Sequence, residues 1–329
     1  MTDRPRPRAR AIVVGEPLIA LLASGSAPLA DVETFGRHVA GAEANVAVGL
    51  ARLGHEVLFV GRVGDDGFGR AIVRRLRGEG VDVSGLTVDP DERTGLLIRE
   101  RRAVGPSEVI YYRAASAGSR VAPADVDAVA GAFLHADWLH VTGITPALSD
   151  SAHEAVLRAV ALARANDVRV SFDVNLRRRL WSDARAAERL RPIAIGADLV
   201  FGDPDELAVV AGPGTSGDGL EAAHTLRAGG AGSVVVKQGA AGATLVAAGE
   251  TRLSPSVSVG RVVDPVGAGD AFCAGYLAAI LDGHDAATAL RWGNGCAAAV
   301  LSVEGDLTGL PSPAELARLV GGDGNDTIR

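Results

Sequence analysis

The chain has 329 residues, of which 47% are hydrophobic and 22% are charged, and its formal net charge is −7. This composition is typical of a globular protein in water, with one large α/β domain or two domains. The negative balance argues against binding to nucleic acid or to an anionic membrane surface, and the sequence has no apolar run of about 18 residues that would span a bilayer.

Lysine and cysteine usage excludes further classes of site. Lys237 is the only lysine among the 33 Lys and Arg residues, and Gln238 follows it, so a P-loop with its Gly-Lys-Ser/Thr is excluded. Cys273 and Cys296 lie among alanines in predicted helices, which favours two buried apolar side chains over a metal site or disulfide. We expect disordered tails at 1–10 and 320–329, and a cytoplasmic protein because no signal peptide pattern follows the first tail.

Strand and helix patterns alternate along residues 11–315, which we treat as one domain. The alternation predicts an α/β fold with an open, mostly parallel sheet and helices on both of its faces. Segment 18–40 reads instead as short antiparallel strands outside this sheet, and segment 86–114 again reads as strands. We expect these two segments to form a small β lid assembled from separate parts of the chain.

The stretch 41–54 is the first candidate ligand site. Helical apolar spacing begins at Ala44 and stops at Gly54. The residues at its start are Gly41, Ala42, Glu43 and Asn45. The two polar side chains lie beside the free amides of a helix start, where they can hold a small polar ligand. The alternative is a buried helix with a glycine entry turn.

The predicted lid strand 109–113 places Tyr111 and Arg113 on one face, because side chains two residues apart point the same way. Arginine binds carboxylates with two parallel hydrogen bonds, so this pair suits an acidic, hydroxylated ligand. The alternative is a solvated face of the lid.

Polar side chains also follow three later strands, where open α/β sheets bind ligands. They are Asp173, Asn175 and Arg177 after the first, Asp203 and Glu206 after the second, and Lys237, Gly239 and Gly242 after the third. Asp203 and Glu206 fit a hard cation, but Asp203 fits a helix cap equally well. Lys237 and its glycines fit the edge of a nucleotide site, although Lys237 also fits an ordinary surface position.

A valine-rich run over 257–263 predicts another strand, and Gly267-Ala268-Gly269-Asp270 follows it at the start of a helix that extends to Leu281. Free amides at a helix start, together with the helix dipole, form an anion hole for phosphate. Asp270 places a carboxylate there that can take a proton from a hydroxyl. The alternative is a glycine turn with Asp270 as a cap.

These motifs, in this order, resemble the ribokinase-like (PfkB) carbohydrate kinases. The resemblance implies that Asp270 is the catalytic base, that Gly267, Ala268 and Gly269 hold the charge of the transferred phosphoryl group, and that the 41–45 stretch contacts the sugar. It also implies ATP and Mg²⁺, with K⁺ as a further candidate cation. Glu206 and Asp203, which replaces the family's usual Asn, would organise the Mg²⁺ and its waters. Asn294 lies on a helix whose small residues make room for adenine.

Within that family, the run Tyr111–Ala117 and the motif Asp173-Val-Asn175-Leu-Arg177 resemble 2-keto-3-deoxygluconate kinases. This resemblance implies that Tyr111, Arg113, Arg177 and Asp306 hold a sugar acid, and that two copies pair through the lid. Two departures are Pro265, where many members carry Thr, and Leu97, where the subgroup often has Tyr. The alternatives are a kinase of fructose or another neutral sugar, and a sugar-binding sensor without catalysis.

Overall fold

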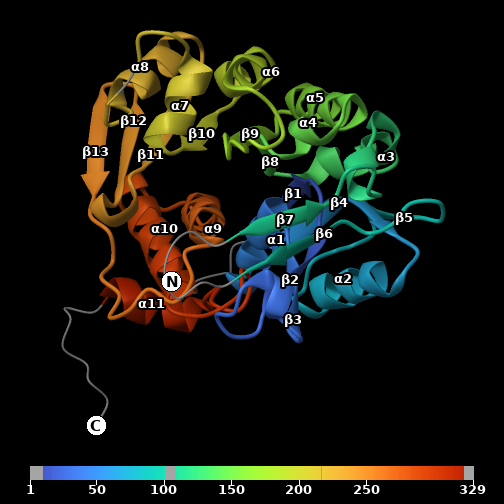
Figure 1. The fold of residues 1–329 in the computed structure, drawn as a ribbon. Helices are drawn as coiled ribbons and strands as arrows, with labels where there is room; N and C mark the ends of the chain where they lie inside the picture. The colour runs from blue at the N-terminus through green and yellow to red at the C-terminus, as the bar shows by residue number, and fades with distance from the viewer. Residues whose placement is uncertain (1–9, 101–107, 216, 322–329) are drawn as a thin grey trace, which may run out of the picture.

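The computed structural model describes residues 10–100, 108–215 and 217–321. Within these ranges the strands form a nine-stranded sheet and a separate four-stranded sheet (Figure 1). The strands are β1 (Arg10–Val14), β2 (Leu18–Ala23), β3 (Phe35–Ala40), β4 (Glu56–Gly64), β5 (Leu86–Asp89), β6 (Leu96–Arg99), β7 (Val109–Tyr112), β8 (Trp138–Thr142), β9 (Arg169–Asp173), β10 (Leu199–Gly202), β11 (Ser233–Lys237), β12 (Ala243–Ala247) and β13 (Glu250–Ser254). The helices are α1 (Ala42–Arg52), α2 (Gly67–Gly78), α3 (Pro123–Asp127), α4 (Thr145–Leu148), α5 (Asp150–Ala165), α6 (Asp183–Gly196), α7 (Pro204–Ala211), α8 (Leu220–Ala228), α9 (Ala268–Leu281), α10 (Ala286–Leu301) and α11 (Pro313–Gly321).

The large sheet has the strand order β13-β12-β11-β10-β9-β8-β1-β4-β5. Its strands are parallel except for the pairs β11–β12 and β12–β13 at one edge. Both faces are covered by helices, which explains the continuous apolar runs of the central strands. In β1, Val13 packs into the core under α1, α9 and α10, while Ile12 and Val14 pack into the core under α5 and α6. The predicted architecture is therefore confirmed.

The β lid has the strand order β3-β2-β6-β7 and comes from two distant segments, as predicted. One part of that expectation is wrong. Strand β5, placed in the lid by the sequence, pairs in parallel with β4 and lengthens the large sheet. Gly85, directly before β5, lies close against β4, because a Cβ there would lie 2.8 Å from the carbonyl oxygen of Phe59.

Helices α1 and α9 approach each other closely. A Cβ on Gly49 would lie 2.5 Å from the Cβ of Ala274, so the two backbones can pack at this distance only with glycine at 49. Asn45 lies about one turn before Gly49, and Asp270 one turn before Ala274. The contact therefore brings the N-terminal ends of both helices to one place.

The strand predicted over 257–263 is wrong. After β13, residues 255–267 return to α9 without strand pairing. Pro255 and Pro265, near the two ends of this segment, have no backbone N–H to donate to a neighbouring strand. Val262 is 54% exposed, and the amide of Val263 donates to the carbonyl of Leu301 at the end of α10.

The predicted tails lie almost entirely outside the described residues. Arg10, assigned to the first tail, already belongs to β1, and residues 320–321 complete α11. Cys273 and Cys296 are both buried and unpaired, as expected. Among the described helices, none combines the length and apolar character needed to cross a bilayer.

Candidate active site

A cavity of about 430 Å³ lies between the lid and the C-terminal ends of the large sheet's strands. Most of the residues predicted for a site line this cleft, although they come from seven separate parts of the chain. From the predicted set these are Gly41, Ala42, Glu43, Asn45, Tyr111, Arg113, Asn175, Arg177, Asp203, Glu206, Lys237, Gly239, Gly267, Gly269, Asp270 and Asp306. Ala268, Gly242 and Asn294 do not line it.

Asp270 lies in the first turn of α9, buried, with both carboxylate oxygens hydrogen-bonded. Asn45 Nδ2 donates to Oδ2 at 2.8 Å, and Asn175 Nδ2 donates to Oδ1 at 3.2 Å. Burial raises the pKa of Asp270 to about 7, against the opposing effect of the Asn45 amide. A carboxylate with this pKa can accept a proton near neutral pH. Asn175 reaches it from a left-handed backbone conformation, φ 40°, which Asn tolerates better than most residues.

Gly267 forms the turn that enters α9. Its φ of 82° is left-handed, and the helix begins at the next residue, Ala268. The first amides of a helix lack intrahelical partners. The amides at this turn therefore lie close to Asp270, in the same first turn of α9. The anion hole itself stays a prediction, and within it Ala268 would act through its backbone amide.

Lys237 lies close to Gly269 of this turn. A Cβ on Gly269 would lie 3.5 Å from Lys237 Nζ. The ammonium contacts both oxygens of the buried Asp173, at 2.7 and 2.9 Å. Burial opposes the charge on Lys237, but its acidic neighbours, Asp173 first and then Cys273 and Glu206, together outweigh burial and raise the pKa of the lysine. The chain's only lysine is therefore a fixed positive charge close to the turn that enters α9, and the surface alternative for Lys237 is wrong.

Arg113 is buried at the lid side of the cleft, where it forms an ion pair with the buried Glu16. Ser116 Oγ donates to the other carboxylate oxygen of Glu16 at 2.6 Å. The guanidinium also lies over the ring of Tyr111, 5.6 Å from its centroid, so these two predicted residues are together. Arg113 Nε, although buried, has no hydrogen-bond partner. Sequence reasoning missed Glu16, whose signal was its position directly after the first strand.

Glu43 was expected to hold a ligand, and the structure gives its carboxylate internal partners as well. Its Oε1 accepts hydrogen bonds from Thr142 at 2.7 Å and Thr145 at 2.6 Å. Burial raises the pKa of Glu43. The side chain thus ties the start of α1 to the loop after β8. Asn45 is the freer neighbour, because its buried Oδ1 has no partner.

A second lid contact, also missed from sequence, reaches the anion-hole turn. Arg99 of β6 forms an ion pair with Asp264. The same carboxylate accepts the amide of Val266 at 3.1 Å, inside the turn that leads to Gly267. Asp306 is buried near this pair, and burial raises the pKa of its carboxyl group.

The predicted metal residues form a capping box at the start of α7. Asp203 accepts the amide of Glu206 at 2.8 Å, and Glu206 Oε2 accepts the amide of Asp203 at 2.9 Å. Glu206 Oε1 accepts the amide of Leu176 at 2.9 Å. The cap interpretation of Asp203 is therefore confirmed. In the described ranges no group of three or more His, Cys, Asp or Glu side chains has the spacing of a metal site.

Two of the predicted nucleotide residues have structural contacts outside the cleft. Asn294 Nδ2 donates to the carbonyl of Pro255 at 3.0 Å and to that of Ser254 at 3.2 Å, which fixes the turn after β13. Gly242 has φ 99°, and a Cβ there would lie 2.1 Å from the carbonyl oxygen of Ser254. Gly239, by contrast, lies at the cleft's edge with open space around it.

Comparison with known proteins agrees with this geometry. Residues 9–313 match the model of the pfkB family carbohydrate kinases. The chain belongs to this family. A protein named 2-dehydro-3-deoxygluconokinase from Thermoproteus tenax is 42% identical over 313 residues, covering 94% of this chain and 93% of the relative. A protein of the same name from Bacillus subtilis is 37% identical, covering 93% and 94%.

The fold also matches solved structures over nearly the whole chain. A putative ribokinase II from E. coli, crystallised with ATP and Mg²⁺, superimposes with a TM-score of 0.88 at 27% identity, covering 95% of this chain and 99% of that one. The predicted ribokinase-like fold and membership of the carbohydrate kinases are therefore confirmed. The roles of individual site residues stay predictions.

The Lys237–Asp173 pair gives a stability prediction. Replacing Lys237 with Met leaves the Asp173 carboxylate buried without its counter-charge, and we expect the free energy of unfolding to fall by about 3–5 kcal/mol. Urea unfolding at pH 7.5 measures this loss. The double variant Lys237→Met/Asp173→Asn removes the buried charge and should recover at least half of it. Arg252→Met, which breaks an exposed ion pair with Glu250, is the control and should cost less than about 1 kcal/mol. Equal losses in both single variants would contradict the prediction.

Proposed function

We propose that this chain is a 2-keto-3-deoxygluconate kinase, which transfers the γ-phosphoryl group of ATP to the terminal hydroxyl of that sugar acid. The observation that carries the proposal is the position of Asp270: a buried carboxylate, held by two amides, lies at a helix start in the same cleft as a buried arginine. The names of the Thermoproteus tenax and Bacillus subtilis relatives support the choice of substrate.

In this proposal Asp270 removes the proton of the terminal hydroxyl. The oxygen attacks the γ-phosphorus, the bond from phosphorus to the bridging oxygen breaks, and ADP leaves with that oxygen. The amides of Gly267–Gly269 and the charge of Lys237 stabilise the negative charge on the transferred group. Asn45 and Asn175 orient the Asp270 carboxylate, and the free Oδ1 of Asn45 is an acceptor for a sugar hydroxyl.

The nucleotide lies along Lys237 and Gly239 in this proposal, with Arg177 at the boundary between the phosphates and the sugar. Mg²⁺ normally binds to one or two carboxylates, to substrate phosphates and to several waters. Asp203 and Glu206 line the cleft but use oxygens in the capping box, which supports contact with Mg²⁺ through water. When bound, Mg²⁺ would neutralise phosphate charge. K⁺ stays a candidate activator.

The sugar acid would lie between Arg113, Tyr111 and Asp306. Arg113 Nε is buried without a partner, which supports a hydrogen bond to a substrate carboxylate. The ion pair of Arg113 with Glu16, however, favours a second candidate, a kinase of a neutral sugar such as fructose. With its charge offset by Glu16, Arg113 would then donate to hydroxyl groups.

A cytoplasmic homodimer that pairs through the lid belongs to the same proposal and rests on the family resemblance. Sedimentation analysis at several protein concentrations would test the dimer. A non-catalytic sensor is disfavoured because Asp270, Lys237 and the Gly267 turn keep a geometry suited to phosphoryl transfer.

The base assignment predicts the behaviour of Asp270→Asn. With Asp270→Asn we expect kcat to fall at least about a hundredfold, since the amide cannot accept the hydroxyl proton. An assay that couples ADP formation to NADH oxidation measures this, in a screen of 2-keto-3-deoxygluconate, its galacto epimer and fructose with ATP and Mg²⁺. Asp285→Asn, a carboxylate at the start of α10, is the control and should keep full activity. Wild-type turnover by Asp270→Asn would refute the role of Asp270, and lack of turnover on every sugar would refute the proposed function.

The raised pKa of Asp270 predicts a pH dependence. The carboxyl group is protonated below about pH 7 and cannot then accept a proton, so kcat/KM should fall on the acidic side of pH 7 by about tenfold per pH unit. The profile of kcat/KM against pH reports the free enzyme, to which this pKa refers. A profile that is flat between pH 5 and 8 would contradict the assignment.

The two candidate substrates predict different effects at Arg113. Because a buried Glu16 would lose its partner in Arg113→Ala, the test uses the double variant Glu16→Gln/Arg113→Gln, which removes both charges. For a sugar acid, we expect kcat/KM to fall about 10- to 100-fold, whereas fructose should lose much less. Equal losses for both sugars would favour the neutral-sugar candidate. A circular dichroism spectrum and a melting curve confirm that the variant folds.

A further inference from the structure

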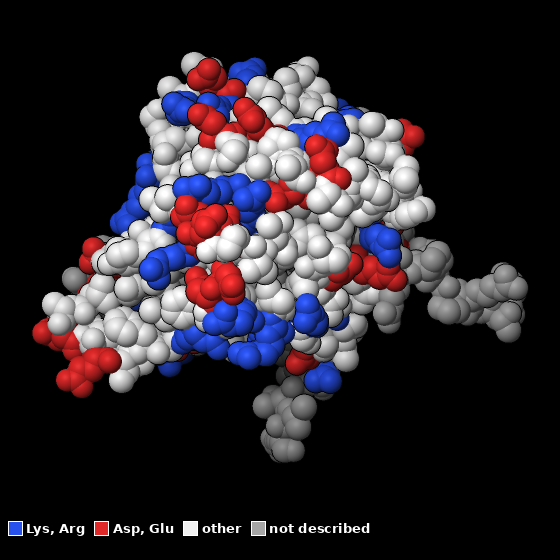
Figure 2. Space-filling view, turned by 90° about the vertical axis from the view of Figure 1, so that its right-hand side faces the viewer, with Lys and Arg blue, Asp and Glu red and all other residues white. Residues whose placement is uncertain are grey.

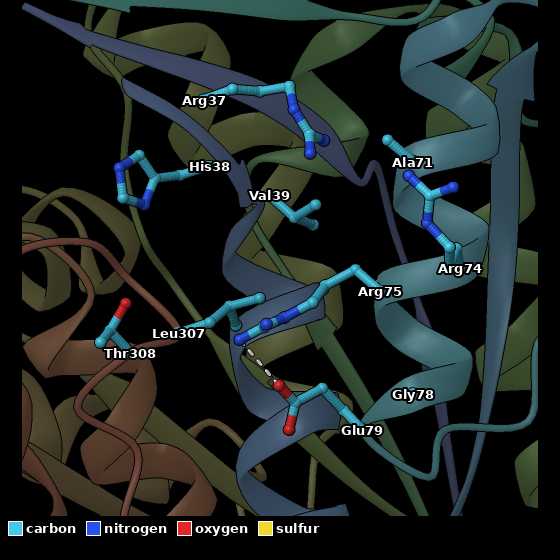
Figure 3. Close-up of a pocket in the computed structure, with 10 residues that line it drawn as sticks. All are labelled: Arg37, His38, Val39, Ala71, Arg74, Arg75, Gly78, Glu79, Leu307 and Thr308. Atoms are coloured by element: carbon cyan, nitrogen blue, oxygen red, sulfur yellow. Dashed lines mark ion pairs between the residues drawn. The ribbon is translucent and has the colours of Figure 1, made fainter. Parts of the chain in front are cut away.

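A second cavity lies on the opposite side of the lid strand β3 from the cleft's sugar-binding residues. Its volume is about 410 Å³, within the range of small-molecule sites. Figure 3 shows its walls: β3 carries Arg37 and His38, α2 carries Arg74 and Arg75, and the loop before α11 contributes Leu307. We call this cavity the arginine groove. It shares no lining residue with the cleft.

The arginine groove carries uncompensated positive charge. Arg37 and Arg74 have no ion pair or hydrogen bond with any residue that the structure describes, and both guanidinium groups point toward the space between β3 and α2 (Figure 3). Arg75 contacts the groove's one carboxylate, Glu79, at 2.8 Å, but Arg52 already holds both oxygens of that carboxylate. Three arginines against one carboxylate leave a formal charge of +2 on the groove's walls.

This charge is notable in a chain with a net charge of −7. Figure 2 shows the molecule from the side on which α2 lies in Figure 1, and Lys and Arg side chains gather low on this face. A bound anion would offset the charges of Arg37 and Arg74 and so stabilise the fold.

The arginine groove also joins three parts of the kinase. It lies between the lid strand β3 and helix α2 of the main domain. Leu307 directly follows Asp306, which lines the cleft. His38 Nδ1 lies 2.8 Å from the position that a Cβ on Gly305 would take, so β3 rests against this same loop. A ligand that contacts both Arg37 and Arg74 would therefore hold the lid against the main domain.

We propose that the arginine groove binds the phosphate group of a small metabolite, a phosphate monoester, and that this binding favours the lid position in which the sugar is held. A phosphate dianion matches the charge of +2, and two guanidinium groups can each donate a pair of hydrogen bonds to its oxygens. When the phosphate ester already holds the lid in place, sugar binding costs less conformational entropy. We therefore expect KM for the sugar to fall while kcat is unchanged. The binding step is independent of the proposed substrate.

Calorimetric titration and melting curves test the binding, with inorganic phosphate and glycerol 3-phosphate as probes and NaCl at equal ionic strength as the blank. The proteins are wild type, Arg37→Ala, Arg74→Ala and the control Arg77→Ala, which removes the same charge from α2 but does not line the arginine groove. We expect a phosphate-dependent rise in Tm, and at least about tenfold weaker binding in the Arg37 and Arg74 variants but not in the control.

Phosphate that binds in the cleft would bind equally to all four proteins, so it cannot produce a difference between them. Tighter binding of the ester than of phosphate identifies the ester as the ligand, and equal binding of the two identifies free phosphate. Equal affinity across the four proteins would overturn the site.

Kinetics test the coupling. In the wild type, glycerol 3-phosphate should lower KM for the sugar at least about fivefold, and Arg74→Ala should abolish this effect without changing kcat. Binding without any change of KM would overturn the coupling and leave the site. Loss of activity on every sugar would instead refute the proposed function, because the binding measurements need no turnover.

Discussion

The close packing of α1 against α9 is the contact on which the site depends. At Gly49 the two helices approach to a distance that admits no side chain, and one turn earlier their first residues meet across the cleft. Asn45 from one helix then donates to Asp270 on the other at 2.8 Å. The carboxylate is thus buried by the same packing that supplies its hydrogen bonds. Burial accounts for the raised pKa, so the close packing of the helix pair and the raised pKa of Asp270 have one origin.

Several charged side chains in and around the cleft form ion pairs, and each partner fixes the charge or the position of the other. Asp173 keeps Lys237 charged beside the anion hole, and Glu16 holds Arg113 at the sugar end. Arg99 of the lid reaches Asp264, whose carboxylate shapes the turn before Gly267. The position of the lid strand β6 and the shape of the turn before Gly267 are therefore physically linked. The remaining buried carboxylates, such as Asp270 and Glu43, have neutral hydrogen-bond donors instead, and burial raises the pKa of both.

Sequence reasoning found most of the cleft because its residues follow strand ends or start helices, and these positions converge in a parallel sheet. Asn175, Asp203 and Lys237 were predicted from three separate strands and lie together. Asn294 was the failure of this approach, since its position on a helix did not reveal that its amide would donate to the backbone after β13. The valine run over 257–263 was likewise ambiguous, because apolar residues that cover a helix end have the same spacing as a strand.

Partners far apart in sequence were beyond prediction. Glu16 and Arg113 are 97 positions apart, and Arg99 and Asp264 are 165 apart. No local sequence pattern indicates such ion pairs, because each depends on how the lid packs over the large sheet. The position of β5 depended in the same way on a tertiary contact, the close approach of Gly85 to the backbone of β4.

The use of a single lysine has a chemical consequence. Acetylating enzymes, amine-reactive cross-linkers and glycating sugars all need a free primary amine. In this chain the only side-chain amine is that of Lys237, which lies in the cleft with its ammonium held by a buried carboxylate. The surface cations are arginines and do not undergo these reactions. Acetylation of this amine would remove the positive charge that faces Asp173, so a single modified side chain would leave that carboxylate buried without its counter-charge.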